Sequence, residues 1–481
     1  MAILDQLEPK RVFSWFEQLC AIPHGSRNTK QVSDWLVQFA ADRGLEHYQD
    51  ELNNVIIRKA AAPGYEAAAP LILQGHMDMV CERAPDCGKD MEREGLELFV
   101  EGDLVGARGT TLGGDDGIAV AMMLALLDAD DIPYPPLECV FTVDEEIGML
   151  GAVGLDVSPL RGRRMLNIDS EAEGVFTVSC AGGRVVNCVL PLRREGFLSS
   201  GAALRIEISG LIGGHSGVEI HKGRANASML LGRVLYALKK ATALRIVSVE
   251  GGLKDNAIPV RAAAQVVVGD AAAAERVCRE REQALRVEYA VTDPGVSVRM
   301  EPGVPETPMD ADSTLRVLCL LQNVLNGVQA MSPDVAGLVQ TSLNLGILTT
   351  SADRVEAAFC VRSSVESQTL MLTDRLQCLT EQLGGTIEIS GDYPGWAFRR
   401  ESPLRDLLTE VYREQYGKEP VVDAIHAGVE CGLFAGKIPD LDCVSIGPDL
   451  SEIHTFRERL HVASTQRTWA LVLETLKRMK A

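Results

Sequence analysis

The sequence predicts an α/β protein in which one α/β domain is interrupted by a large α+β insertion. In the first third of the chain, short apolar runs alternate with helix-like stretches, which indicates a sheet that is buried on both faces. The middle of the chain has strand-like segments between long amphipathic helices, and the α/β pattern returns after it. We therefore expect a catalytic domain made of residues 1–184 and 392–481, with residues 185–391 as the inserted domain.

The expected elements of the first part begin with an amphipathic stretch from Asn28 to Gly44, where Asn28 is in the N-cap position. Four strand-like apolar runs and one helix-like run of small residues follow. The expected strands are Asn54–Ile57, Leu71–Leu73, Cys139–Val143 and Met165–Ile168, and the expected helix is Gly117–Leu127. Because open α/β sheets bind ligands at the carboxyl ends of their strands, the residues that follow these runs are the first candidates for a site.

The inserted part has its own set of expected elements. The strands are Leu204–Ser209, Val260–Val268, Val296–Met300, Ala357–Val361 and Thr386–Ile389, and the helices are Arg224–Lys240, Ala271–Tyr289 and Gln368–Leu383. Few residues of this part resemble metal ligands. We therefore expect the metal chemistry to lie in the two flanking segments.

Composition and charge exclude several classes of function. A chain of 481 residues is long enough for two domains with separate cores. A formal charge of −20 argues against nucleic acid or an anionic membrane as the main partner. The N-terminus has no apolar core of a signal peptide, and no long uncharged apolar stretch predicts a membrane span. The 12 cysteines include no C-x-x-C pair, so we expect reduced thiols in a cytoplasmic protein.

Metal-ligating residue types follow the expected strands. His76 ends one apolar run, and Asp78 lies two residues on, where a carboxylate can orient a ligating imidazole through its other N–H. The glycine-rich turn before Asp115 lacks the lysine of a phosphate loop, and its acids would repel phosphate. A carboxylate that bridges two cations fits this turn better. An ordinary strand-end histidine and a simple N-cap turn are the alternative interpretations of these two motifs.

Further carboxylates follow the next two runs. Glu145 and Glu146 are adjacent, so on an extended chain one can bind a metal while the other faces the attacking water; an exposed acidic turn is the alternative. Asp169 follows the last run, and His454 supplies a distant second imidazole. Together these residues provide two imidazoles, enough carboxylates for two ions that share a bridge, and one carboxylate for proton transfer. This inventory favours a two-metal hydrolase.

The order of these motifs resembles that of the co-catalytic zinc aminopeptidase and carboxypeptidase family, which includes aminoacylases and succinyl-diaminopimelate desuccinylases. Within that family the chain is most similar to the aminoacyl-histidine dipeptidases, also called Xaa-His or cytosolic non-specific dipeptidases. The similarity covers essentially the whole chain. Its markers are Gln74–Val80, Thr110–Gly113, Asn167–Glu171 and Ile425–Gly432. The resemblance implies a zinc-exopeptidase-like α/β/α catalytic domain with an inserted α+β lid domain.

The resemblance also implies a role for each candidate. Two zinc ions are expected, with Co²⁺ or Mn²⁺ as substitutes that suit the same donors. The implied ligands are Asp115 as the bridge, His76 and Asp169 for one ion, and Glu146 and His454 for the other. Glu145 is implied as the general base and Asp78 as the residue that orients His76.

Two further features concern the bridging position. The resemblance implies a cis peptide bond between Asp115 and Asp116. Relatives often have asparagine where this chain has Asp116, and the extra negative charge is expected to raise metal affinity or to alter the pKa of a neighbouring carboxylate.

In the lid the resemblance implies three substrate-binding residues, His215, Asn256 and Arg362. His215 would polarise the scissile carbonyl, and the guanidinium of Arg362 suits a substrate carboxylate. The expected substrates are dipeptides, in particular Xaa-His and β-alanyl-histidine (carnosine), and a homodimer through the lid is one expected assembly. An N-acyl amino acid deacylase of the same family and a non-enzymatic metal-binding scaffold are the two alternatives.

Overall fold

The computed structural model describes residues 3–196 and 201–480, and the chain divides into two compact units. The first unit extends to Ser179 and also contains Phe398–Ala424 and the chain from Val429 onward. The second unit is Cys180–Ala397 with the short segment Ile425–Gly428. The boundaries expected from the sequence fell after residues 184 and 391. None of the helices in the described ranges has the combined length and hydropathy needed to cross a bilayer.

The first unit is built on an eight-stranded sheet in the order β1-β2-β6-β3-β7-β21-β8-β20. Its strands are β1 (Glu46–Gln49), β2 (Val55–Lys59), β3 (Leu71–His76), β6 (Leu137–Thr142), β7 (Arg164–Asn167), β8 (Val175–Cys180), β20 (Val421–Ile425) and β21 (Asp442–Ser445). β3 is parallel to both β6 and β7, and β21 is parallel to β7. All residues of β3 and β6 are buried, as the uninterrupted apolar runs predict for a sheet covered on both faces.

The helices of the first unit are α1 (Lys10–Cys20), α2 (Lys30–Asp42), α3 (Gly114–Asp128), α4 (Leu150–Gly154), α9 (Pro403–Tyr416), α10 (Glu430–Lys437) and α11 (Val462–Arg478). α3 packs against β3 and α1, and α10 packs against β21 and α4. The expectation that Asn28 caps the second helix is wrong. The N-cap residue of α2 is Thr29, while the side-chain amide of Asn28 donates to the carbonyl of Glu92 at 3.0 Å.

A four-stranded sheet in the same unit supports the last candidate ligand. Its order is β22-β23-β5-β4, with bounds β4 (Leu98–Glu101), β5 (Leu104–Ala107), β22 (Leu450–Ser451) and β23 (Arg459–His461). The loop that carries His454 connects β22 to β23. Since Leu460 of β23 pairs with Val105 of β5, the sheet anchors this late loop to the first part of the chain, which carries the other expected ligands.

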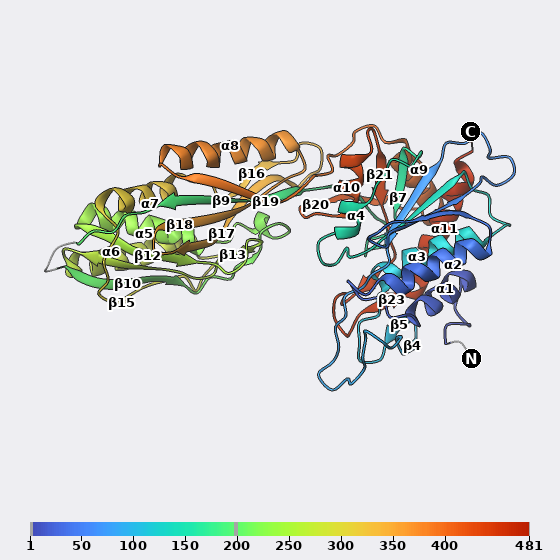
Figure 1. Ribbon diagram of the computed structural model, residues 1–481, viewed down its shortest axis with the longest axis horizontal. Coiled ribbons are helices and arrows are strands. Elements are labelled where there is room, and N and C mark those ends of the chain that lie inside the picture. Colours follow the sequence, from blue (N-terminus) through green and yellow to red (C-terminus); the bar gives the residue numbers. More distant parts are fainter. Residues whose placement is uncertain (1–2, 197–200, 481) are drawn as a thin grey trace. The chain divides into compact units, whose positions relative to one another are not determined.

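The second unit contains a nine-stranded sheet with the order β15-β10-β14-β12-β17-β18-β9-β19, to which β16 adds at β17. The strands are β9 (Gly182–Pro191), β10 (Ala202–Ser209), β12 (Leu244–Gly251), β14 (Ala262–Val268), β15 (Ser297–Pro302), β16 (Gly327–Met331), β17 (Val339–Thr350), β18 (Arg354–Ser363) and β19 (Thr386–Tyr393). A separate pair is β11 (Gly214–His215) with β13 (Ala257–Ile258). Figure 1 shows helices lying along this sheet. They are α5 (Ala227–Ala241), α6 (Ala271–Glu288), α7 (Ala311–Asn323) and α8 (Glu366–Gln382), with a 3-10 turn at Ile220–Lys222.

Candidate metal centre

The centre of the candidate site is Asp115, which lies between two histidines. Its Oδ1 is 3.1 Å from Nε2 of His76, and its Oδ2 is 3.2 Å from Nε2 of His454. Each histidine also meets a carboxylate of its own. Oδ1 of Asp169 lies 3.5 Å from Nε2 of His76, and Oε2 of Glu146 lies 3.0 Å from Nε2 of His454. Ligand atoms of a tetrahedral zinc ion stand about 3.3–3.6 Å apart, so the donor set and its spacing fit two cations that share Asp115.

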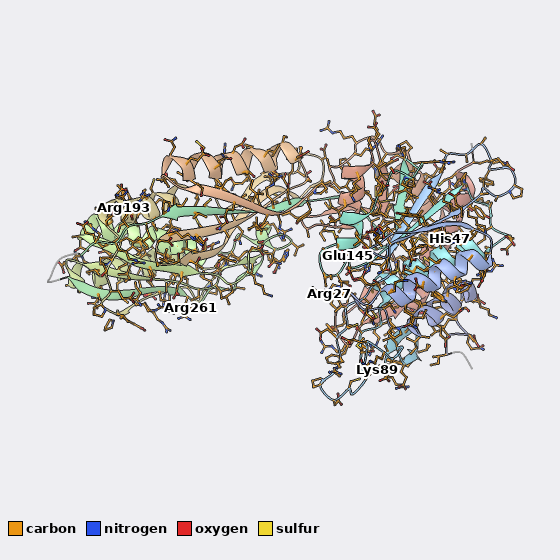
Figure 2. All side chains as sticks on the ribbon, in the orientation of Figure 1. Arg27, His47, Lys89, Glu145, Arg193 and Arg261 are labelled. Carbon is orange, nitrogen blue, oxygen red and sulfur yellow. The ribbon has the colours of Figure 1, made fainter. Side chains whose placement is uncertain are left out.

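Strand order explains why residues far apart in the sequence meet. His76 is the last residue of β3, and Asp169 follows the end of β7 by two residues. Glu145, which is labelled in Figure 2, and Glu146 follow β6. These three strands are neighbours and run parallel. Their carboxyl ends therefore open at one edge of the sheet, where α/β proteins place binding sites.

Asp115 is held by an unexpected glutamate. Oε2 of Glu458 accepts the N–H groups of Leu112 and Gly113 at 2.7 and 3.0 Å, and Oε1 accepts those of Gly114 and Asp115 at 2.8 and 3.3 Å. Glu458 thus binds the backbone at the start of α3 and, four residues after His454, ties the two loops together. The peptide bond between Asp115 and Asp116 is cis, as the resemblance implied.

Asp78 connects His76 to Glu145. Its Oδ1 accepts the backbone N–H of Glu145 at 3.0 Å, and its Oδ2 accepts the hydroxyl of Ser26 at 2.8 Å. Nδ1 of His76 lies 3.0 Å from the carbonyl oxygen of Asp78 and 3.5 Å from Oδ1. Nδ1 of His76 is directed at these acceptors, which leaves Nε2 directed at Asp115 and Asp169, as a metal-ligating imidazole requires.

The pKa values of the cluster show the effect of crowded buried carboxylates. Burial raises the pKa of Asp169 to about 6, and burial together with neighbouring acids raises the pKa of Glu145 to about 9. Hydrogen bonds to Asp115 and Glu146 raise the pKa of His454 to about 10. Burial alone would raise the pKa of Asp115, but the two histidines hold it well below its usual range. Without bound cations, protons would supply the positive charge that the carboxylates require.

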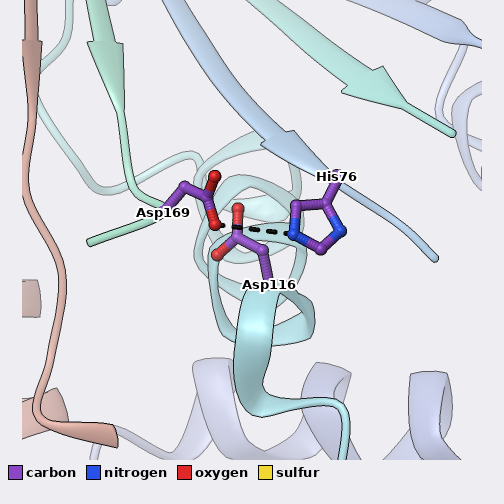
Figure 3. A group of neighbouring side chains, drawn as sticks. All are labelled: His76, Asp116 and Asp169. Carbon is purple, nitrogen blue, oxygen red and sulfur yellow. Dashed lines mark ion pairs between the residues drawn. The ribbon is translucent and has the colours of Figure 1, made fainter. Parts of the chain in front are cut away.

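A further carboxylate approaches His76 and Asp169. Ligand-type atoms of His76, Asp116 and Asp169 all lie within 4.8 Å of one another, as do those of His76, Asp115 and Glu146 (Figure 3). Oδ2 of Asp116 and Oε1 of Glu146 are buried, and neither has a hydrogen-bond partner in the described part of the chain. Burial and the charge of Asp169 raise the pKa of Asp116 well above its usual range. These orphan oxygens are a second sign that the cluster is built for cations.

In the second unit, His215 ends β11 and has a defined tautomer. Its Nδ1 accepts the backbone N–H groups of Gly217 and Val218 at 3.1 and 3.2 Å. Burial and the charge of Arg362 lower the pKa of His215. The imidazole is therefore neutral, with its N–H on Nε2. Asn256 lies close to His215, because its backbone carbonyl accepts the N–H of Ser216 at 2.8 Å. The side chain of Asn256 is exposed.

Arg362 belongs to a buried cluster of bases in the same unit. It is 7% exposed, its Nη1 donates to the hydroxyl of Tyr393 at 2.8 Å, and its Nε has no hydrogen-bond partner in the described ranges. Ser342 of β17 is paired with Arg362 of β18. The hydroxyl oxygen Oγ of Ser342 lies 2.8 Å from Nε2 of His426. Burial, followed by the charges of Arg362 and His215, lowers the pKa of His426 to about 3. This arrangement offers donors to an anion.

The comparisons with known proteins agree with this geometry. Residues 72–478 match the model of peptidase family M20/M25/M40. The chain belongs to this family. It is accordingly a hydrolase of peptide bonds, with the mixed α/β fold of M20 peptidases.

Individual relatives cover the full length of the chain. It is 35% identical to the cytosol non-specific dipeptidase of Escherichia coli over 488 residues, which is 100% of both chains. A crystal structure of aminoacylhistidine dipeptidase from Vibrio alginolyticus matches with a TM-score of 0.94 and 33% identity, and the match covers 99% of this chain and 98% of that one. The aminopeptidase PepT of Bacillus cereus, at 17% identity and a TM-score of 0.57 over 99% and 100% of the two chains, shares the fold.

Sequence reasoning left several residues of these sites without a role. Glu458 and Tyr393 were not assigned, and His426 and Glu430 were noted only as part of a marker motif. Oε2 of Glu430 accepts from Gln74 and Thr142 at 2.6 and 2.7 Å, behind the strand ends that carry the cluster. Two signals in the sequence were available for these residues. Glu458 is an acid four residues after His454, and His426 and Glu430 are polar residues in an otherwise apolar marker.

Proposed function

We propose that this peptidase is a dinuclear zinc dipeptidase that cleaves Xaa-His dipeptides, including carnosine. One observation carries the two-metal part: Asp115 presents one oxygen to each of two histidines, and each histidine has a second carboxylate beside it. The names of the full-length relatives, a non-specific dipeptidase and an aminoacylhistidine dipeptidase, support dipeptides as substrates.

In this proposal His76 and Asp169 hold one ion, Glu146 and His454 hold the other, and Asp115 bridges them. Zinc suits the mixture of imidazole and carboxylate donors, and Co²⁺ or Mn²⁺ are accepted by the same set. Ions bound by these residues would supply Lewis acidity, which lowers the pKa of a bound water to about 7. The remaining steps depend on residues of the chain.

Glu145 acts as the general base. It takes a proton from the attacking water and returns it to the leaving amine, which splits the peptide into two amino acids. Its backbone N–H bonds to Asp78, which also contacts Nδ1 of His76. Asp78 is therefore the residue that keeps the base and a metal ligand in a fixed relation. Burial raises the pKa of Glu145 to about 9 without metal, and the positive charge of two bound cations would lower it again, which leaves the carboxylate ionised and able to accept a proton.

The second unit supplies substrate-binding groups. His215, neutral with an Nε2–H, is suited to donate to the oxygen on which negative charge develops. Arg362, buried and with an unused Nε–H, is suited to the free carboxylate of the C-terminal residue. Asn256 is a second polar contact. Recognition of a free carboxylate next to the scissile bond limits the C-terminal side of the cut to one residue, and the dipeptidase names of the relatives support a short N-terminal side.

We also propose a location, the excluded partners and an assembly for the enzyme. The cytosol named for the Escherichia coli relative supports a cytoplasmic location, and the formal charge of −20 does not favour nucleic acid or membranes as partners. A homodimer through the second unit is proposed as its assembly. The exposed apolar side chains Ile212, Leu253 and Val260 of this unit support an interface there, and sedimentation velocity tests it.

Substrate competition tests the function. The zinc-loaded protein is assayed with carnosine, alanyl-histidine, other dipeptides, a tripeptide and N-acetyl amino acids. We expect hydrolysis of the dipeptides with Xaa-His among the best, and little turnover of the tripeptide. Preference for N-acetyl amino acids would assign the chain to the deacylases, and no turnover by a metal-loaded protein would favour a scaffold.

A further inference from the structure

Asp116 is a buried carboxylate for which the proposed mechanism has no use. Its side chain is directed to the same place as those of His76 and Asp169, and the ligand-type atoms of the three residues lie within 4.8 Å of one another (Figure 3). Asp116 is only 1% exposed. Solvent therefore cannot satisfy its charge.

The contacts of Asp116 differ from those of Asp442, another buried aspartate of the first unit. Asp442 accepts the hydroxyl of Ser402 at 2.5 Å and the N–H of Leu404 at 2.9 Å. Oδ2 of Asp116, in contrast, has no hydrogen-bond partner among the described residues. A buried carboxylate without donors is strongly unfavourable unless a cation or a proton accompanies it.

The local backbone makes room for this carboxylate beside His76. A Cβ atom at Gly75 would lie 2.4 Å from Oδ2 of Asp116, so only glycine fits directly before the histidine. The torsions of Asp115 (φ −83°, ψ 106°) and Asp116 (φ −113°, ψ 31°) are not helical, although both lie at the start of α3. Successive residues of a regular helix point about 100° apart, whereas here both side chains approach His76.

We propose that Asp116 is an additional carboxylate ligand of the cation that His76 and Asp169 hold, an inference that rests on the two-metal function proposed above. That cation then has one imidazole and three carboxylates, including the bridge, before any water is counted. Once water binds, this cation has more than four ligands. Its site is also richer in oxygen than the second site, which His454, Glu146 and the bridging Asp115 form. Oxygen-rich sites favour Mn²⁺ relative to Zn²⁺ more than tetrahedral sites do.

Metal titration of Asp116→Asn tests this ligand, because asparagine keeps the shape and removes the charge. The matched control is Asp442→Asn, the same change at a buried aspartate at the start of β21, the opposite end of the sheet. Stoichiometry and affinity for Zn²⁺ and Mn²⁺ are measured by equilibrium dialysis, and the Co²⁺ forms are compared by visible absorption. All variants are first compared by circular dichroism.

We expect Asp116→Asn to lose about 10- to 100-fold in affinity at one of two positions, with a greater loss for Mn²⁺, while Asp442→Asn matches the unmodified protein. The Co²⁺ d–d absorption of the variant should strengthen as coordination falls towards tetrahedral. Two ions bound with unchanged affinity and spectrum would overturn the role of Asp116 alone, whereas an unmodified protein that binds no metal would overturn the proposed function. If Asp116→Asn does not fold, the Co²⁺ spectrum of the unmodified protein decides, since an intense tetrahedral spectrum at both positions contradicts the inference.

Discussion

The histidines of the two units have pKa values that are shifted in opposite directions. In the first unit, carboxylates raise the pKa of His454 to about 10, and those around His76 outweigh burial and raise its pKa as well. In the second unit, burial and Arg362 lower the pKa of His215, and they lower the pKa of His426 to about 3. The first pair is surrounded by negative charge that calls for cations. The second pair is neutral beside a buried guanidinium, which suits an anion or a developing oxyanion.

The largest effect should follow from removing the proposed base. Glu145→Ala should lower kcat about 10²- to 10⁴-fold, because the water then loses its proton acceptor. Bound zinc should be retained, since Glu145 is not among the proposed ligands. The exposed Glu101→Ala at the end of β4 serves as the control for mutating a glutamate in this unit. Substantial turnover by a zinc-loaded Glu145→Ala protein would remove the base from the account.

The next effect tests the neutral histidine of the second unit. His215→Ala should lower kcat about 10²- to 10³-fold with a smaller change in KM, because a donor to developing charge acts mainly in the transition state. His221→Ala, an exposed histidine in the nearby 3-10 turn, is the control. Steady-state kinetics with one dipeptide measures both. An equal loss in the two variants would show that His215 has no special role.

Arg362→Lys should have a smaller effect, and one on binding. Lysine keeps the charge but loses the paired donors of the guanidinium, so KM should rise about 10- to 100-fold while kcat changes less. Arg354→Lys on the same strand is the control, because Arg354 is exposed and pairs with Glu356. A fall in kcat at constant KM would contradict carboxylate binding by Arg362.

The smallest effect is a pH dependence that separates the metal-free protein from the metal-loaded one. Asp169, Glu145 and His454 have folded-state pKa values of about 6, 9 and 10, each above the unfolded value. Their contribution to stability is therefore complete at low pH and is lost as pH rises through the folded pKa values. Asp115, whose pKa is lowered, titrates below this range and does not reverse the sign.

Melting curves at several pH values measure this dependence. From about pH 5 to about pH 9 the thermal midpoint of the chelated protein should fall, because the folded cluster gives up protons that the unfolded chain had already lost at lower pH. Zinc replaces those protons, so the zinc-saturated protein should change less over the same interval. A midpoint of the chelated protein that rises with pH would show that the cluster does not dominate.

Much of the fold was accessible from the sequence because apolar runs report burial directly. The four strands expected in the first part are β2, β3, β6 and β7, and they carry or precede the candidate ligands. β9, β12 and β17 of the second unit were not foreseen, since their alternating polar residues weaken the apolar signal. The cap at Asn28 was wrong because an N-cap depends on backbone torsions that composition does not report.

The candidate site could be predicted from the sequence about as far as the fold could. The order of histidines and acids predicted five ligands, and the structure brings the other four close to Asp115, because strand ends bring such residues to one edge. Glu458 was not assigned a role, and Asp116 was expected only to affect metal affinity or the pKa of a neighbouring carboxylate. Their contacts depend on the conformation of the turn before α3, where one binds four backbone N–H groups and the other approaches Gly75. Spacing in a sequence does not determine the direction of such side chains.

The most direct test of the account is a zinc titration of the chelated protein and of Asp115→Ala, with bound metal counted after equilibrium dialysis. If Asp115 bridges two ions, the unmodified chain binds two zinc ions, and the variant loses affinity at both positions together. A chain that binds one zinc ion or none, or an Asp115→Ala variant that keeps two ions with unchanged affinity, would contradict the central claim.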